Sequence, residues 1–357
     1  MHKKLFIPGP VDVRPDVLQK MADPMISHRG KAATSLQKSI SEKLKKVFQT
    51  SNTIVLSTTS GSGLMESAIR CCTAKRAAVF SIGAFGDRWY KMAVTNNVPA
   101  DKFRAEDGKA TDPKDVDAAL ATGKYDLVTI THNETSVGIM NPVEEIAKVI
   151  RKYPDVIFCM DTVSSMGGTS IPVDELGVDF CITSTQKCLG LPPGMSIASV
   201  SERGYERAKT VPFRGLYLDI VEIYDKVVKD DKYQYPSTPS LSHMFAMDYQ
   251  LGLILEEGLD NRFARHLEMA EVVRAWAKKY FALFADERYL SNTLTTIANT
   301  RGINVSDLNK KLAEYGYEIS NGYGALKEKT FRIAHMADMD MDTLQGLLRK
   351  IEEILGL

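Results

Sequence analysis

Short apolar segments rich in β-branched residues alternate with amphipathic segments along the first two thirds of the chain. The apolar segments have the length of strands, and the amphipathic ones repeat their apolar positions with the helical period. This alternation is typical of a mostly parallel sheet covered by helices, an α/β fold. It predicts strands at 53–56, 77–82, 127–131, 156–160, 180–183 and 196–200, and helices at 64–70, 88–94, 113–120 and 143–151.

The alternation ends near Gly204. The Tyr-, Pro- and charge-rich stretch 207–239 predicts irregular structure, and a long helix pattern follows it. Gly258 is a plausible helix break, after which 261–281 predicts a second long helix with Arg262, Arg265 and His266 on its polar side.

The C-terminal third has a different pattern. It predicts a strand at 293–298, a helix at 305–315, a strand at 331–335 and a helix at 341–355. An α+β segment of this kind indicates a separate, smaller domain. We therefore expect an N-terminal segment 1–15, a large domain 16–257 and a small domain 258–357.

The amino-acid composition limits which partners and which cellular compartment we expect for this protein. The 357 residues are 44% hydrophobic, and 45 basic residues balance 45 acidic ones, so nothing favours nucleic acid or an anionic membrane as partner. The five cysteines show no metal-ligand spacing, and their odd number without a signal-peptide pattern indicates a reducing compartment. We expect a cytoplasmic protein with no metal site, no nucleic-acid partner and no membrane partner.

An acid and a lysine follow two neighbouring predicted strands. Asp161 comes directly after the strand at 156–160, and Lys187 comes shortly after the strand at 180–183. A lysine amine forms a Schiff base with the aldehyde of pyridoxal phosphate (PLP), and a carboxylate keeps the cofactor's pyridinium nitrogen protonated. Singly, Asp161 is better explained as a strand cap and Lys187 as a solvated loop residue. Together with the loop described next, they predict a PLP site.

Residues 57–63, rich in Ser, Thr and Gly, lie between a predicted strand and a predicted helix. Glycines let a backbone approach an anion, hydroxyls donate to it, and a helix N-terminus offers unpaired amides. This is a candidate phosphate loop, although it matches neither the Walker A motif nor the Gly-x-Gly-x-x-Gly fingerprint. On its own, an ordinary turn is the commoner explanation.

Three further segments carry candidate residues. Phe85 can stack on a planar cofactor, or simply pack the first turn of its helix. In the polar stretch 131–138, His132 and Glu134 suggest acid–base chemistry, but a Thr135 hydroxyl facing the cofactor, with Glu134 holding the loop, is the simpler use. Arg332 lies among apolar strand residues and needs a partner, either a substrate carboxylate or a structural salt bridge.

These pieces, in this order, resemble the class V branch of fold-type I PLP-dependent aminotransferases. Within that branch the chain is most similar to the alanine–glyoxylate, serine–pyruvate and serine–glyoxylate aminotransferases. The likeness spans nearly the whole chain, through segments 8–10, 60–63, 131–138, 161–168, 184–187, 192–194, 235–239 and 331–333.

The resemblance implies a role for each matching position. Lys187 is the Schiff-base lysine, Asp161 the pyridinium partner, and Thr135 a contact near the ring's phenolic oxygen. Arg332 and the backbone of Gly9, in the N-terminal segment, bind the substrate. Ser62, Gly63 and Gln186 bind the phosphate, and Tyr235 and Thr238 reach that phosphate from the other subunit of a homodimer. The remaining cofactor-binding positions are Leu64 and Phe85.

Two positions depart from the family pattern. Many relatives carry tryptophan where Phe85 stands and histidine where Leu64 stands. Phenylalanine still stacks on a ring, so cofactor binding remains expected. The pair His28-Arg29 is similar to one in prokaryotic members, and the sequence gives it no role.

The implied activity is transfer of the amino group of a small amino acid, of the alanine or serine type, to glyoxylate or pyruvate by a ping-pong mechanism. Alternatives are an aspartate, ureidoglycine or aminophosphonate transaminase, or a cysteine desulfurase or lyase. The last two usually have histidine directly before the lysine and a cysteine on a mobile loop, whereas Gln186 precedes Lys187 and segments 207–240 and 317–330 contain no cysteine. A nucleotide-binding α/β protein without PLP is the alternative from another class.

Overall fold

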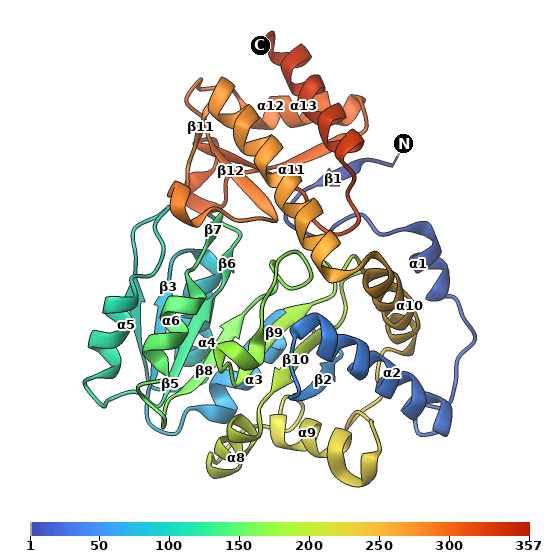
Figure 1. Cartoon of the computed structure of the whole chain (residues 1–357), viewed down its shortest axis with the longest axis vertical. Coiled ribbons are helices and arrows are strands. Elements are labelled where there is room, and N and C mark those ends of the chain that lie inside the picture. The colour runs from blue at the N-terminus through green and yellow to red at the C-terminus, as the bar shows by residue number, and fades with distance from the viewer. Residues whose placement is uncertain (1) are drawn as a thin grey trace.

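A seven-stranded sheet forms the centre of the large part of the molecule in the computed structural model, which describes residues 2–357 (Figure 1). Its strand order is β2-β10-β9-β8-β5-β3-β4, and only β10 runs antiparallel to its neighbours. The strands are β2 (Thr53–Ser57), β3 (Ala77–Ser81), β4 (Ala100–Arg104), β5 (Leu127–Thr131), β8 (Ile157–Asp161), β9 (Phe180–Ser184) and β10 (Ser196–Val200).

All six predicted strands of this sheet are confirmed, and β4 was missed. β4 lies at the sheet edge, and its residues Asp101, Lys102 and Arg104 are partly exposed, so it lacks the apolar run of a buried strand. The inner strands are buried on both faces, as expected for a parallel sheet between helices.

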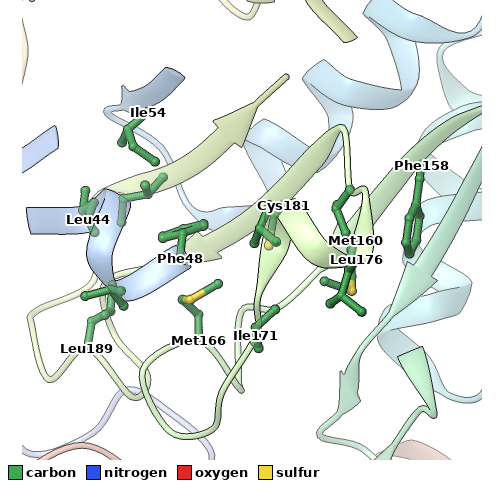
Figure 2. Packing of buried hydrophobic residues seen from close by; sticks show 14 of the residues in the cluster. Leu44, Phe48, Ile54, Phe158, Met160, Met166, Ile171, Leu176, Cys181 and Leu189 are labelled. Atoms are coloured by element: carbon green, nitrogen blue, oxygen red, sulfur yellow. The ribbon is translucent and has the colours of Figure 1, made fainter. Parts of the chain in front are cut away.

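Helices cover both faces of the large sheet. They are α2 (Lys31–Phe48), α3 (Gly61–Cys72), α4 (Ala84–Thr95), α5 (Pro113–Leu120), α6 (Val143–Ile150), α8 (Glu202–Thr210), α9 (Ile220–Val228) and α10 (Leu241–Glu257). Figure 2 shows Leu44 and Phe48 of α2 packed near Cys181 of β9, in one of the two main hydrophobic clusters that flank the sheet.

The C-terminal third of the chain forms most of a second, five-stranded sheet. Its strand order is β1-β13-β14-β12-β11, and β1 pairs with β13 in parallel, so the N-terminal residues join the C-terminal sheet. Its strands are β1 (Lys4–Phe6), β11 (Ala282–Leu283), β12 (Leu294–Ala298), β13 (Tyr317–Asn321) and β14 (Thr330–Ala334), with helices α11 (Leu259–Tyr280), α12 (Val305–Glu314) and α13 (Met341–Leu355). The domain boundaries proposed above stay a prediction.

The remaining elements are short. They are α1 (Pro15–Lys20), β6 (Asn133–Glu134), β7 (Ile139–Met140), α7 (Val173–Leu176) and the 3-10 helices η1 (Lys229–Asp231), η2 (Glu287–Tyr289) and η3 (Gly324–Leu326). No helix within residues 2–357 has the length and apolarity needed to cross a membrane.

The prediction that 207–239 is irregular was wrong. Helix α9 lies inside this stretch, and α8 overlaps its start. The side chain of Asp219 accepts a hydrogen bond from the Val221 amide and caps α9, which buries Ile220, Ile223 and Val227. The charges and prolines that flank this short helix hid its apolar spacing.

The prediction that Arg262 and His266 lie on a polar face was also wrong, because both side chains are fully buried. The Arg262 guanidinium pairs with Glu257 at 2.7 Å and with Asp338 at 2.9 Å, and donates to the Cys188 carbonyl at 2.8 Å. Arg262 therefore fastens α11 to the loop that follows Lys187.

Candidate active site

The candidate residues gather at the carboxyl edge of the large sheet. Asp161 is the last residue of β8, Lys187 lies shortly after β9, and the phosphate loop leads from β2 into α3. Open α/β sheets place their ligands at this edge.

Lys187 lies in a dry environment, where the Asp161 carboxylate acts on the pKa of its amine in one direction and the Arg332 and Arg88 guanidinium groups in the other. Its Nζ donates a hydrogen bond to the carbonyl oxygen of Pro8. Burial lowers the pKa of the amine to about 8, and the charges of Arg332 and Arg88 act in the same direction. A substantial fraction of the amine is therefore neutral near physiological pH, which is the form that attacks an aldehyde.

Asp161 is a buried carboxyl group, 4% exposed, with few partners. Its Oδ1 accepts a hydrogen bond from the Val163 amide at 2.8 Å, and no ion pair forms on it within the described part of the chain. Burial raises its pKa to about 7. A buried carboxyl group of this kind is well suited to receive a cationic N–H.

Gly9 lies directly against Lys187. A Cβ atom at position 9 would be 2.7 Å from Cδ and 2.9 Å from Nζ of Lys187, and the backbone there has φ +94°. Both the contact and the left-handed backbone require glycine. The N-terminal segment thus passes close over the lysine, as the implied position of Gly9 in the substrate pocket requires.

The phosphate loop is tightly built. Helix α3 begins at Gly61, so Ser62 and Gly63 lie in its first turn. A Cβ at Gly63 would be 2.6 Å from the Thr59 hydroxyl, and the side chain of Leu64 is buried in the hydrophobic cluster beneath the helix. The hydroxyl of Ser184 and the side-chain carbonyl of Gln186 are buried without a hydrogen-bond partner among residues 2–357.

Glu134 holds the start of α4. Its carboxylate accepts hydrogen bonds from the amides of Phe85 at 2.9 Å and Gly86 at 3.0 Å, and from Ser136. These contacts favour the loop-holding role over acid–base chemistry. His132 is buried against the Ser165 hydroxyl, and burial lowers its pKa to about 4, so its ring is neutral.

Arg332 on β14 has no carboxylate partner among the described residues. Its guanidinium donates to the backbone carbonyls of Thr135 at 3.0 Å and Asn321 at 3.1 and 3.2 Å. The alternative of a structural salt bridge on Arg332 is therefore wrong, as far as residues 2–357 are concerned. Burial lowers the Arg332 pKa to about 10, which still leaves a cation available for an incoming anion.

Two residues beside these were not predicted. The ring of Tyr323 lies 5.6 Å from the Arg332 guanidinium carbon and 5.8 Å from the Phe85 ring. The second residue is Arg88. Its guanidinium carbon lies 4.8 Å from the centre of the Phe85 ring, and its Nη1 donates to the Ser62 hydroxyl at 3.1 Å. Tyr323 follows β13, a strand that the sequence pattern did not indicate, and Arg88 lies in the second turn of α4.

The Tyr235 segment lies behind the phosphate loop of its own chain. The Tyr235 hydroxyl is 3.4 Å from the Ser57 hydroxyl, and Thr238 is exposed. Arg29 donates to the carbonyls of Tyr235 at 2.6 Å and Pro236 at 3.0 Å, so the arginine of the His28-Arg29 pair fixes this segment. Whether Tyr235 and Thr238 serve the neighbouring subunit stays a prediction.

This set of groups fits PLP. A partly neutral lysine amine and a buried carboxyl group correspond to the aldehyde and the pyridinium of the cofactor. The Ser- and Gly-rich loop before α3, with the unpartnered hydroxyl of Ser184 close to Gly61, corresponds to its phosphate.

Comparison with known proteins agrees with this chemistry. A sequence model of the family described as Aminotransferase class-V matches residues 17–342. The chain belongs to the class V aminotransferase family. It is 39% identical to an uncharacterised aminotransferase of Methanocaldococcus jannaschii in an alignment that covers 94% of this chain and 88% of the relative. It is 31% identical to the serine–glyoxylate aminotransferase of Arabidopsis thaliana in an alignment that covers 98% of this chain and 90% of the relative.

A solved structure shares the whole fold of this aminotransferase. The alanine–glyoxylate aminotransferase of Nostoc sp. superposes with a TM-score of 0.94 at 26% identity, covering 99% of this chain and 96% of that one. The predicted fold, a fold-type I transferase with a mostly parallel sheet and a smaller C-terminal α+β part, is confirmed.

Proposed function

We propose that this aminotransferase binds PLP at Lys187 and transfers the amino group of a small amino acid, of the alanine or serine type, to glyoxylate or pyruvate by a ping-pong mechanism. The observation that carries the proposal is the arrangement of three groups at one sheet edge. The Lys187 amine has a lowered pKa. The Asp161 carboxyl group is buried and has few hydrogen-bond partners. The Arg332 guanidinium donates to backbone carbonyls and has no carboxylate partner among the described residues.

Each of these groups has a defined task. When bound, PLP supplies an aldehyde for covalent attachment of an amino group and a protonated ring that withdraws electrons. Arg332 binds the substrate carboxylate with its planar fork and orients the α-carbon. The Lys187 amine, with a pKa near neutrality, removes the α-proton and later returns it. Asp161 holds the ring proton throughout.

The choice of small substrates is supported by the relatives and by the site. The Arabidopsis relative is named a serine–glyoxylate aminotransferase and the Nostoc structure an alanine–glyoxylate aminotransferase. The ring of Tyr323 lies 5.6 Å from the Arg332 guanidinium carbon, and an aromatic wall at that place would favour a short substrate side chain. Donors of the aspartate, ureidoglycine and aminophosphonate types are the alternatives.

A desulfurase or lyase activity fits the structure less well. Such chemistry needs a reactive thiolate that can reach the substrate. Burial instead raises the pKa of every one of the buried cysteines, Cys71, Cys72, Cys159, Cys181 and Cys188.

A donor-by-acceptor matrix tests the proposed substrates. Purified protein with PLP is assayed with alanine, serine, aspartate, ureidoglycine and 2-aminoethylphosphonate against glyoxylate and pyruvate. We expect the highest kcat/KM with alanine or serine, and parallel lines in double-reciprocal plots, which indicate a ping-pong mechanism. Lys187→Ala is the matched control and should be inactive with every pair. Highest activity with another donor would contradict the substrate assignment, and intersecting lines would contradict the mechanism.

We also propose that the active sites are shared in a homodimer, with Tyr235 and Thr238 reaching the phosphate of the neighbouring subunit. The exposure of Thr238 on the single chain and the fixing of its segment by Arg29 support this arrangement.

A further inference from the structure

The expected phosphate ligands of this site carry no positive charge. Ser62, Gly63 and Gln186 offer a hydroxyl, a backbone amide and a side-chain amide. The phosphate of PLP is close to a dianion at neutral pH, since the second pKa of a phosphate monoester is about 6. Removing such an anion from water without a cation beside it is costly. The N-terminus of α3 supplies only a partial positive charge, so a cationic side chain beside the loop would stabilise a bound phosphate further.

Arg88 is placed to supply that charge. It lies in the second turn of α4, and its Nη1 donates to the Ser62 hydroxyl at 3.1 Å, in the first turn of α3. Its guanidinium also lies 4.8 Å from the ring centre of Phe85. The guanidinium group thus lies over an aromatic ring, while its Nη1 donates toward the phosphate loop.

The charge of Arg88 is not neutralised by a carboxylate of the described residues. The adjacent Asp87 is engaged elsewhere, by Lys102 at 3.0 Å and Arg104 at 3.6 Å. Arg88 is near enough to Lys187 and Asp161 for its charge to lower the pKa of both groups. A cation without a paired carboxylate therefore lies at the phosphate loop, and its charge acts on the residues expected to hold the cofactor ring.

We propose that Arg88 is a cofactor-binding residue that donates hydrogen bonds to the phosphate of PLP and neutralises its charge. This proposal rests on the proposed cofactor. The Ser62 hydroxyl, which accepts from Arg88 in this structure, keeps its own hydrogen for the same phosphate. The competing explanation is structural, with Arg88 serving only to hold Phe85 and Ser62 in place.

Comparing PLP with pyridoxal, which lacks the phosphate, separates the two explanations. Dissociation constants of both compounds are measured by absorbance and fluorescence titration of the apoprotein. For Arg88→Gln we expect PLP binding weakened about ten- to a hundredfold, the loss of one charge-assisted contact, and pyridoxal binding within about twofold of the wild type. Arg88→Lys keeps the charge without the fork, so it should lose less PLP affinity, again with pyridoxal unchanged.

Two further variants complete the experiment. Phe85→Leu removes a ring contact and should weaken both compounds, which is the pattern expected of a structural defect. Arg104→Gln is the matched control, because Arg104 pairs with Asp87 and Asp107 away from the loop, and it should bind both compounds like the wild type.

The proposal is overturned if Arg88→Gln weakens PLP and pyridoxal equally, or if it weakens neither. Should Arg88→Gln fail to fold, the same comparison in Arg88→Lys decides, and an equal effect on both compounds overturns the proposal. Failure of the cofactor assignment itself has a different signature, because the wild-type protein would then show no preference for PLP over pyridoxal.

Discussion

The side-chain amine of Lys187 donates a hydrogen bond to the backbone carbonyl of Pro8. This contact joins the N-terminal segment, whose strand β1 belongs to the C-terminal sheet, to a loop at the edge of the large sheet. The residue that follows Pro8 is Gly9, which has no room for a side chain beside the lysine. The N-terminal segment therefore lies directly against the proposed Schiff-base lysine.

Gly9→Ala should disable the site while leaving most of the fold intact. The added Cβ would lie within 3 Å of three side-chain atoms of Lys187, at a backbone φ of +94° that alanine adopts poorly. We expect PLP affinity to fall at least tenfold and turnover to fall with it. The matched control is Gly252→Ala on α10, where a Cβ meets no atom within 4 Å. Equal behaviour of the two variants would contradict the assigned contact.

Arg332→Lys tests the carboxylate-binding role. A lysine keeps the charge but loses the planar fork that matches a carboxylate. We expect KM to rise roughly ten- to a hundredfold for every amino acid and oxo acid, the loss of about one charge-assisted contact, while PLP affinity stays nearly constant. An unchanged KM together with a lower melting temperature would instead show that Arg332 serves the fold through Thr135 and Asn321.

The raised pKa of Asp161 predicts a pH-dependent stability of the apoprotein. Because burial raises its pKa to about 7 from an unfolded value of 3.8, the folded protein holds a proton between these pH values that the unfolded chain has lost. The stability from this proton is complete below about pH 4 and disappears as the pH rises through 7. Asp161→Asn removes this titration. The free energy of unfolding of the variant, relative to that of the protein with Asp161, should therefore increase by roughly 2–3 kcal/mol between pH 5 and pH 8.

The comparison is best made in the Lys187→Ala background, because the charge of Lys187 lowers the Asp161 pKa. Melting temperatures of Lys187→Ala and of Lys187→Ala with Asp161→Asn are measured across the pH range. A constant difference would show that Asp161 does not titrate there. With Lys187 intact, Asp161→Asn should still bind PLP but turn over slower by several orders of magnitude.

Mixing two inactive variants tests the shared active site. Lys187→Ala is combined with the double variant Tyr235→Phe with Thr238→Ala, and subunits are allowed to exchange at limiting PLP. In a mixed dimer, one site inherits both defects and the other inherits neither, so about a quarter of all sites become intact after random exchange. Recovered activity supports the shared site. Verified exchange without recovery would show that Tyr235, 3.4 Å from Ser57 of its own chain, acts within one subunit.

The sequence predicts those parts of this protein that depend on local patterns. Strand ends place Asp161 and Lys187, and glycine spacing places the phosphate loop, because each signal lies within a few residues. Other contacts join residues far apart in the chain, so no local pattern indicates them. They are the contacts of Arg88 with Ser62, of Tyr323 with Arg332 and of Arg29 with Tyr235. The burial of Arg262 was not predicted, because an arginine side chain is normally exposed. Its ion pairs with Glu257 and with the distant Asp338 form only in the folded chain, and they allow its burial.

Reduction with borohydride followed by peptide mapping tests the central claim most directly, namely that PLP binds covalently to Lys187. The wild-type protein should be yellow, should bleach on reduction, and should carry the cofactor on the peptide containing Lys187. Lys187→Ala should stay folded and carry no label. Label on another lysine, or a folded wild-type protein that takes up no PLP, would contradict the account.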